Sequence, residues 1–386
     1  MASCTLFEGS ALRERYRRLF SAEPRVFRAP GSVNLMGEDA VYNEGFVLAA
    51  AIGLSTRVVA HPTQSDNFIA HIESARRHES ADLAEARPGN WSEPLRNILS
   101  LLRQRDRAPH GANLLIEEDF PDCPGLGRRA SLEVAAVLAL LEAAGMELSR
   151  LEIAQLCRLA ERLRGADSID ADPFISCHAR EGHALFLDCR SLEYHHVPLP
   201  ERVSLLICHT GVHSREIAGI SARHRAQCDE AAQILSSYLP GTTSFRDLTA
   251  GQLSGYRELF EESAYRRCQH VTEENDRVMR AGIALLDNDL RTAGGLMNES
   301  HESLRLNCGA GCPELDLLAR LARECRGVWG ARMSGPAPGG YLVCLVEVER
   351  ATAIARAITH GYRAQTGIQC ETWLCRAAEG AGEEMF

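Results

Sequence analysis

The sequence contains no lysine, so all 42 residues counted as Lys or Arg are arginines. No side chain can therefore act as an amine nucleophile or form a Schiff base with a carbonyl substrate. A compositional bias of the genome is the simplest explanation for this absence. Long apolar runs are missing too, since no stretch reaches the roughly 18–20 residues that a membrane span needs. Residues 13–18 form a charged amphipathic segment, which is not typical of a secretory signal.

Fourteen cysteines occur without a CxxC pair or a signal peptide, which indicates reduced, mostly buried thiols in a cytoplasmic protein. Cys308 and Cys312 are the closest pair, and no second His or Cys pair at ligand spacing accompanies them, so we expect no metal site. The formal charge of −10 argues against nucleic acid or an anionic membrane as the main partner. The expected partner is a small molecule.

At 386 residues the chain is long enough for two domains. Apolar, turn-bounded segments predict strands, and apolar or amphipathic periodicity predicts helices. The expected strands are 46–52, 56–63, 66–74, 111–120, 183–189, 203–209, 327–334 and 341–348; the expected helices are 130–144 and 150–164, with a largely helical region from about 210. We predict an α+β protein with domains 1–195 and 196–386 and a cleft between them, and a solvated acidic tail over 379–384.

A glycine loop, Pro124 to Ser131, runs directly into the apolar helix. Unpaired backbone N–H groups and the helix dipole favour an anion at such a junction. A nucleotide-phosphate loop normally adds small hydroxyls, which bind phosphate oxygens and help to hold Mg²⁺. Arg128 and Arg129 stand where those hydroxyls are expected. The loop therefore has the shape of a phosphate cradle but lacks the usual side chains for the metal.

Three segments, 28–38, 124–131 and 330–340, resemble the three motifs of the GHMP small-molecule kinases, and of galactokinases in particular. Further similarity covers nearly the whole chain, for example at Tyr42–Leu48 and Cys312–Asp316. The resemblance implies an N-terminal domain like ribosomal protein S5 domain 2 and a ferredoxin-like C-terminal domain. It does not imply the activity, because function depends on particular residues.

By this resemblance, Asp172 is the catalytic aspartate that orients or deprotonates the sugar hydroxyl, a task that suits an ionised carboxylate. Glu161 matches the Mg²⁺-binding glutamate, and Trp91 matches the aromatic of the adenine pocket. Simpler interpretations remain open. The Asp172–Pro173 pair is a common turn start, Glu161 has helical neighbours that would form a solvated ion pair, and Trp91 could be a core residue.

On the substrate side, Glu38 matches the acidic residue that touches the sugar, and we include Asp39 and Tyr42 with it. Ser32 stands where galactokinases carry an arginine near the transferred phosphoryl group. Val41 replaces an aspartate that binds sugar hydroxyls, and its methyl groups cannot accept their hydrogen bonds.

On the phosphate side, the three consecutive serines of the galactokinase motif are replaced by Gly127, Arg128 and Arg129 in this sequence. Pro336 and Pro338 interrupt the third motif. Proline donates no N–H, so a phosphate-facing amide could be lost. The predicted anion-binding residues are Gly125, Gly127, Arg128, Arg129 and Ser131.

These changes share a direction, because an arginine is lost on the sugar side and two are gained on the phosphate side. We hypothesise that Arg129 occupies the place of Mg²⁺ and pairs with Glu161. A guanidinium can clamp an anion but cannot bridge two phosphates as a divalent cation does. The alternative is that Arg128 and Arg129 both point into solvent.

The sequence thus predicts a divergent galactokinase-like protein, not itself a galactokinase. It would use its cleft to bind or transform a sugar-like or anionic small molecule without the usual Mg-ATP chemistry. One alternative is an ATP-dependent sugar kinase with an altered substrate and Asp172 as base, for which ATP and Mg²⁺ would be cofactors. Another is a non-catalytic regulatory or sensor protein.

Overall fold

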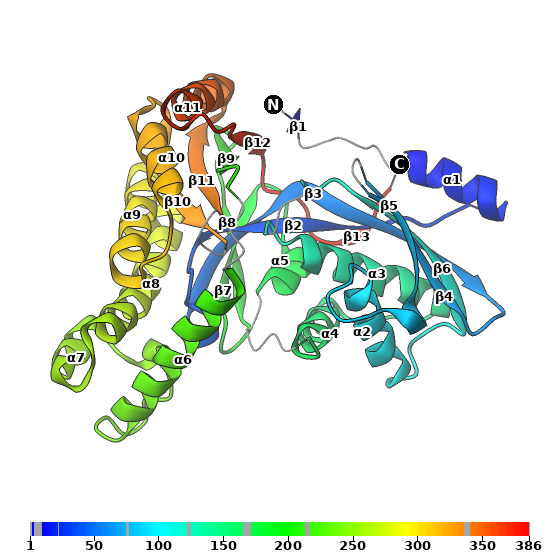
Figure 1. Ribbon diagram of the computed structural model, residues 1–386, viewed down its shortest axis with the longest axis horizontal. Helices are drawn as coiled ribbons and strands as arrows, with labels where there is room; N and C mark the ends of the chain where they lie inside the picture. Colours follow the sequence, from blue (N-terminus) through cyan, green and yellow to red (C-terminus); the bar gives the residue numbers. More distant parts are fainter. Residues whose placement is uncertain are drawn as a thin grey trace. The chain divides into compact units, whose positions relative to one another are not determined.

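The computed structural model describes residues 2–3, 10–21, 23–74, 77–121, 125–164, 171–212, 217–335 and 340–385 (Figure 1). The chain divides into two compact units, each built from separate stretches of sequence. Unit 1 comprises Met1–Ser3, Val33–Ala50 and Gly182–Ala377. Unit 2 comprises Cys4–Ser32, Ala51–Glu181 and Ala378–Phe386.

Most of the helices belong to unit 1, whose elements beyond residue 182 are strands β7 (His183–Asp188), β8 (Tyr194–Pro198), β9 (Val203–His209), β10 (Val328–Ser334), β11 (Tyr341–Glu347) and β12 (Glu371–Cys375), and helices α6 (Ile217–Ser236), α7 (Ala250–Ser254), α8 (Glu262–Leu286), α9 (Leu290–Ser303), α10 (Pro313–Glu324) and α11 (Ala351–Thr366). A π-helical turn, η5 (Leu304–Cys308), follows α9 directly. The short strand β1 (Ala2–Ser3) also belongs to this unit.

Unit 2 holds strands β4 (Phe68–Ser74), β5 (Arg77–Asp82), β6 (Gly111–Glu118) and β13 (Gly382–Glu383), and helices α1 (Ser10–Phe20), α2 (Glu93–Arg103), α3 (Arg128–Ala144), α4 (Arg150–Arg162) and α5 (Asp172–His178). Two long strands, β2 (Phe27–Met36) and β3 (Phe46–Thr63), contribute residues to both units.

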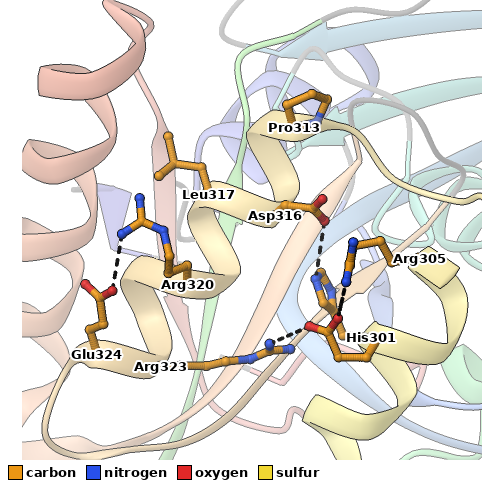
Figure 2. A pocket seen from close by; sticks show the side chains of 9 residues that line it. His301, Arg305, Pro313, Asp316, Leu317, Arg320, Arg323 and Glu324 are labelled. Carbon is orange, nitrogen blue, oxygen red and sulfur yellow. Dashed lines mark hydrogen bonds and ion pairs between the residues drawn. The ribbon is translucent and has the colours of Figure 1, made fainter.

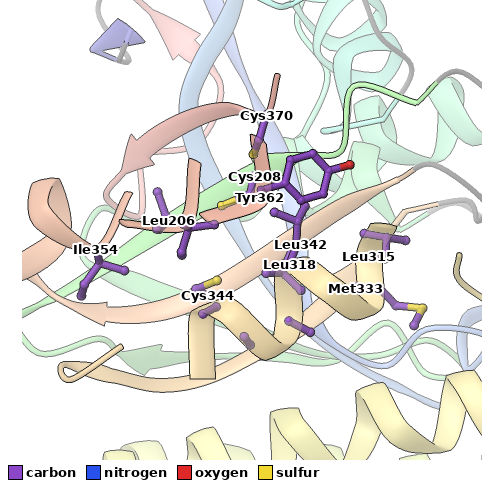
Figure 3. Packing of buried hydrophobic residues seen from close by; sticks show 14 of the residues in the cluster. Leu206, Cys208, Leu315, Leu318, Met333, Leu342, Cys344, Ile354, Tyr362 and Cys370 are labelled. Atoms are coloured by element: carbon purple, nitrogen blue, oxygen red, sulfur yellow. The ribbon is translucent and has the colours of Figure 1, made fainter. Parts of the chain in front are cut away.

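A five-stranded sheet with the order β1-β12-β9-β11-β10 forms the centre of unit 1. Helices α10 and α11 pack against it over a core that includes Leu318, Leu342 and Ile354 (Figure 3). Helix α9 approaches β10 closely, because a Cβ on Gly294 would lie 2.2 Å from the carbonyl oxygen of Trp329. Only a glycine permits this contact, which fixes α9 beside the strand.

In unit 2, the strands belong to the sheet with the order β13-β2-β3-β6-β4-β5. Helices α2, α3, α4 and α5 pack against one another (Figure 1). Helix α3 is apolar nearly all round, and Val134, Ala135 and Val137 are fully buried. A helix of this composition is stable only inside a domain, and this burial fixes the position of the loop that precedes it.

Most of the predicted elements are present, with two differences. The predicted strands 46–52 and 56–63 are one continuous strand, β3, which crosses Gly53 without a break. The acidic tail is not a solvated end, because β13 pairs with β2 and Glu384 accepts a hydrogen bond from Arg57 at 2.8 Å. The division into domains 1–195 and 196–386 stays a prediction.

Candidate functional site

The loop that leads into α3 has three consecutive residues with positive φ: 109° at Gly125, 58° at Leu126 and 64° at Gly127. A left-handed conformation costs a leucine about 1–2 kcal/mol, so surrounding contacts must hold it. The side chain of Leu126 is buried, and its carbonyl accepts a hydrogen bond from the N–H of Ser32 at 3.0 Å. The loop is therefore anchored on strand β2.

Two glycines make this anchoring possible. A Cβ on Gly31 would lie 2.3 Å from the carbonyl oxygen of Leu126, and a Cβ on Gly127 would lie 2.2 Å from Oγ of Ser32. Both distances are too short for any side chain in this arrangement. Gly127 is thus required by the position of the Ser32 side chain.

Ser32 also contacts the predicted catalytic residue. Its Oγ donates a hydrogen bond of 2.6 Å to Oδ1 of Asp172, the first residue of α5. The start of α5 is tied to the same strand, because Oγ of Ser176 donates to the carbonyl of Pro30 at 2.9 Å. Asp172 is therefore part of a helix rather than a turn, and it lies beside Ser32.

The two loop arginines each form an ion pair with a buried carboxylate. Arg128 donates from Nε and Nη2 to Oε2 of Glu118, at 3.2 and 2.7 Å. Arg129 donates from Nη1 to Oε2 of Glu161 at 2.8 Å. The side chain of Arg129 is 51% exposed, whereas that of Glu161 is 4% exposed, so the guanidinium covers a carboxylate that is otherwise buried.

The other oxygen of Glu161 is occupied as well. Oε1 accepts a hydrogen bond from Nη1 of Arg164 at 3.3 Å. Burial would raise the pKa of Glu161, but hydrogen bonding with Glu133 and the charge of Arg129 outweigh it and lower the pKa. Glu161 is thus an ionised carboxylate neutralised by two guanidinium groups.

Magnesium, which the resemblance implies at Glu161, does not fit this donor set. Mg²⁺ requires carboxylate oxygens at about 2.0–2.1 Å in octahedral geometry. Both oxygens of Glu161 accept from Arg129 or Arg164, and the guanidinium charges would repel a cation. Among the residues that the structure describes, no group of three or more His, Cys, Asp or Glu is arranged to hold a metal ion.

Arg164 connects Glu161 to the segment that holds Trp91. Its Nε donates to Oε2 of Glu93 at 3.2 Å, and the same oxygen accepts from the N–H of Gly89 at 2.7 Å. Trp91 lies half-buried within this turn, directly before α2. Its role in a nucleotide pocket stays a prediction.

Ser131 has a structural role. Its fully buried Oγ donates to the carbonyl of Ala29 at 2.7 Å and accepts from the N–H of Thr56 at 2.9 Å. Its own N–H donates to the carbonyl of Gly127. Both donors of Ser131 are therefore used, and its Oγ holds α3 on β2 and β3, although the sequence analysis placed this residue among the anion ligands.

In unit 1, Glu38 is held by the third motif. Its Oε1 accepts from the N–H of Gly335 at 3.2 Å, and its Oε2 accepts from Nη1 of Arg332 at 3.3 Å. Arg332 is fully buried, and its Nε and Nη2 atoms lack a hydrogen-bond partner in the described part of the chain. Burial raises the pKa of Glu38, and the charge of Arg332 opposes this effect. Sequence reasoning quoted Arg332 within its motif but missed its contact with Glu38.

Asp39 follows with a φ of 61°, and its Oδ2 lies 3.5 Å from Nδ1 of His224 on α6. Burial would raise the pKa of Asp39, but hydrogen bonding to His224 and the electrostatic effect of the nearby His270 outweigh it and lower the pKa. Burial, together with the charge of Asp39, raises the pKa of Tyr42. Tyr42 is therefore neutral beside an ionised carboxylate.

Helix α8 supports the same motif through residues that the sequence did not reveal. Oε1 of Glu274, which is fully buried, accepts from the N–H of Gly37 at 3.0 Å and from Oγ of Ser300 at 2.6 Å. Oδ1 of Asn275 accepts from the N–H of Phe46 at 3.0 Å. The sequence signal that could have revealed them is the adjacent polar pair Glu274 and Asn275 within a helix, because buried polar groups require hydrogen-bond partners.

Three residues of the predicted motifs lie outside the described residues, namely Pro124, Pro336 and Pro338. Apart from Cys312 and Cys325, the described cysteines are buried. In the described ranges, no helix has the length and apolarity that a bilayer span requires.

Comparison with known proteins decides the family. Three family models match the chain: the galactokinase galactose-binding signature at residues 14–62, the GHMP kinase N-terminal domain at 94–179 and the GHMP kinase C-terminal domain at 283–364. The galactokinase of Roseiflexus sp. (strain RS-1) is 33% identical over 386 residues, covering 98% of each chain. That of Chloroflexus aggregans is 35% identical over 382 residues, covering 97% of each. The chain belongs to the galactokinase family.

Solved structures agree with this assignment. Lactococcus lactis galactokinase, solved in complex with galactose, matches with a TM-score of 0.90 and 27% identity, covering 97% of this chain and 99% of that one. A mevalonate kinase with 19% identity and a TM-score of 0.63 shares the fold. The predicted family and the two-domain GHMP kinase fold are confirmed.

Proposed function

We propose that this galactokinase-family protein binds a sugar-like, hydroxylated ligand at its first motif, and that Arg129 takes the place of Mg²⁺ at its phosphate loop. The chain would then bind or transform a sugar-like or anionic small molecule without the usual Mg-ATP chemistry. The observation that carries the proposal is the engagement of both oxygens of Glu161 by guanidinium groups.

The first motif supports the sugar-like ligand. Glu38 is fixed by Arg332 and the Gly335 N–H, which leaves a carboxylate of defined orientation in the segment matched by the galactose-binding signature. Carboxylates recognise hydroxyl groups by accepting their hydrogen bonds. Val41, at the position of the family's second carboxylate, supplies no acceptor, so the preferred ligand differs from galactose.

The phosphate loop supports an anion without a metal. Arg129 is half-exposed, so its guanidinium can hold Glu161 and still reach a ligand. A guanidinium binds phosphate or carboxylate with paired hydrogen bonds. It does not bridge β- and γ-phosphates, so phosphoryl transfer would lose much of the electrostatic stabilisation that a divalent ion supplies.

Thermal-shift measurements with ATP, in the presence and absence of Mg²⁺, test this proposal. We expect the change in Tm to be the same with and without the metal for the natural chain. The variant Arg129→Ser, which frees Oε2 of Glu161, should acquire a shift that depends on Mg²⁺. A shift in the natural chain that requires Mg²⁺ would overturn the proposal.

The second candidate is an ATP-dependent sugar kinase with an altered substrate. It is favoured by Asp172, which the structure retains as an acidic first residue of α5 beside Ser32, and by relatives named galactokinase. In this case Asp172 would accept the proton of the sugar hydroxyl. ADP release across a panel of sugars, abolished by Asp172→Asn, would establish it.

A further inference from the structure

Unit 1 contains a cavity of about 700 Å³ along helix α10, lined also by the end of α9 and by η5 (Figure 2). The side chains that line it include His301, Glu302, Arg305, Asp316, Arg320 and Arg323. None of these residues belongs to the three motifs. Their chemistry is therefore not explained by the proposed function.

His301 presents a hydrogen-bond donor to this cavity. The residue is 1% exposed, and its Nδ1 accepts from the N–H of Met333 at 3.2 Å. Burial and the charge of Arg323 lower the pKa of His301 to about 4, so the ring is neutral. Since Nδ1 accepts, the hydrogen-bond network assigns the ring proton to Nε2.

Asp316 presents an acceptor next to that donor. Nε2 of His301 lies 3.6 Å from Oδ1 of Asp316, which is longer than a hydrogen bond. This oxygen is buried and accepts no hydrogen bond from the described residues, whereas the side chain as a whole is 40% exposed, so the carboxylate meets the cavity through Oδ2. A hydroxyl group both accepts and donates, so one ligand hydroxyl can satisfy the imidazole N–H and the carboxylate together.

Arg305 supplies positive charge beside this pair (Figure 2). Burial raises the pKa of Asp316, and the charge of Arg305 opposes this effect. Its Nε and Nη2 donate to Oε2 of Glu302, whose other oxygen accepts from Arg323. The side chain of Arg305 is 40% exposed, so the guanidinium remains open to a ligand anion.

We propose that this cavity binds a small hydroxylated anion, with a hydroxyl on His301 and Asp316 and an acidic group on Arg305. A sugar phosphate and a hydroxycarboxylate share this chemistry. The cavity is linked to the first motif, because His301 binds Met333, and the preceding residue, Arg332, holds Glu38. The ligand would thus contact a histidine that is hydrogen-bonded to β10, the strand that positions the predicted sugar-binding carboxylate.

Isothermal titration of the full chain with glucose 6-phosphate and with malate tests the proposal, with glucose and inorganic phosphate as comparison ligands. We expect at least one of the two hydroxylated anions to bind more tightly than either comparison ligand. Arg305→Gln and Asp316→Asn should each weaken that binding about tenfold or more. Arg356→Gln, the same charge change at an exposed position of α11, should leave it unchanged.

Binding of glucose 6-phosphate would indicate a sugar phosphate as the ligand, and binding of malate would indicate a hydroxycarboxylate. Either result supports the proposal. Absence of binding by both anions would overturn it, as would equal affinity for inorganic phosphate, or equal affinities of the Arg305→Gln and Arg356→Gln variants. Glu38→Gln separates this site from the first motif. If Glu38→Gln abolishes binding and Arg305→Gln does not, the ligand occupies the first motif and the cavity proposal fails, while the proposed function stands.

Discussion

Oγ of Ser32 lies 2.2 Å from the point that a Cβ at residue 127 would occupy, so these two residues fit together only while position 127 is glycine. We expect Gly127→Ala to destabilise the protein by about 2–4 kcal/mol, through the clash and the left-handed backbone together. Gly145→Ala is a matched control, because Gly145 has a φ of 63° but nothing within 4 Å of its Cβ position. It should cost only about 1 kcal/mol.

Urea unfolding of both variants measures the difference. In a Ser32→Ala background, the excess cost of Gly127→Ala should fall, because the Oγ is gone. Equal costs for the two glycine variants would mean that the loop moves away from Ser32 freely.

Ser131→Ala should lower stability without changing the affinity for anions. Removal of Oγ leaves the carbonyl of Ala29 and the N–H of Thr56 without their buried partner, a loss of about 1–3 kcal/mol. Ser92→Ala is the comparison, since Oγ of Ser92 is buried without a hydrogen-bond partner among the described residues, and its removal should be nearly neutral. Urea unfolding and phosphate titration check both parts; weaker phosphate binding by the folded Ser131→Ala variant would restore the anion-ligand role.

Arg332→Met should destabilise unit 1 by about 3–5 kcal/mol, because it removes the charged partner of Glu38 from a buried position. Combining it with Glu38→Gln should recover part of the loss, since no unpaired charge is then left. Arg17→Met breaks an exposed pair with Glu23 and should cost no more than about 1 kcal/mol. Denaturant unfolding of the natural chain, the single variants Arg332→Met, Glu38→Gln and Arg17→Met, and the double variant measures these losses. Strictly additive losses for Arg332→Met and Glu38→Gln would contradict the coupling of Arg332 to Glu38.

Stability should fall as the pH drops from about 6.5 to 4, because of His301. Its pKa is lowered to about 4 in the folded protein, whereas an unfolded histidine titrates near 6.5. The unfolded chain therefore binds the extra proton first in this window, and the loss amounts to roughly 3 kcal/mol at its lower end. Above about pH 6.5, His301 is neutral in both the folded and the unfolded chain, and this loss of stability is absent.

Unfolding free energies measured between pH 4 and 8 test this dependence. His301→Gln should show a flatter slope between pH 4 and 6.5 and the same slope as the natural chain above pH 7. An unchanged slope in the acidic range would show that His301 is protonated as easily in the folded chain as in the unfolded one.

The sequence predicted those parts of the fold that depend on local pattern. The continuous apolar composition of 130–144 predicted all of helix α3 except its first two residues, Arg128 and Arg129, which are not apolar. The break expected within β3 does not occur, since cross-strand pairing on β6 carries the strand beyond Gly53 to Thr63. The tail was misjudged because the partners of Glu383 and Glu384, Arg25 and Arg57, lie more than 300 residues earlier.

The candidate site divides in the same way. The pairing of Arg129 with Glu161 could be inferred because the resemblance implied a role for each position and the two side chains carry opposite charges. Arg332, Glu274 and His224 contact the first motif from distant segments, and no local pattern links them to it. Contacts of this kind are set by tertiary packing, which periodicity and spacing do not report.

The pairing of β13 with β2 bears on how the protein can be handled in practice. Residues 382–383 cover backbone groups of Phe27 and Arg28, and Glu384 shares Arg57 with Asp119. A truncation after residue 377 would uncover a strand edge, which invites pairing with a second molecule. Shortened versions should therefore aggregate more readily than the full chain, and an affinity tag fused at this end would extend directly from the sheet.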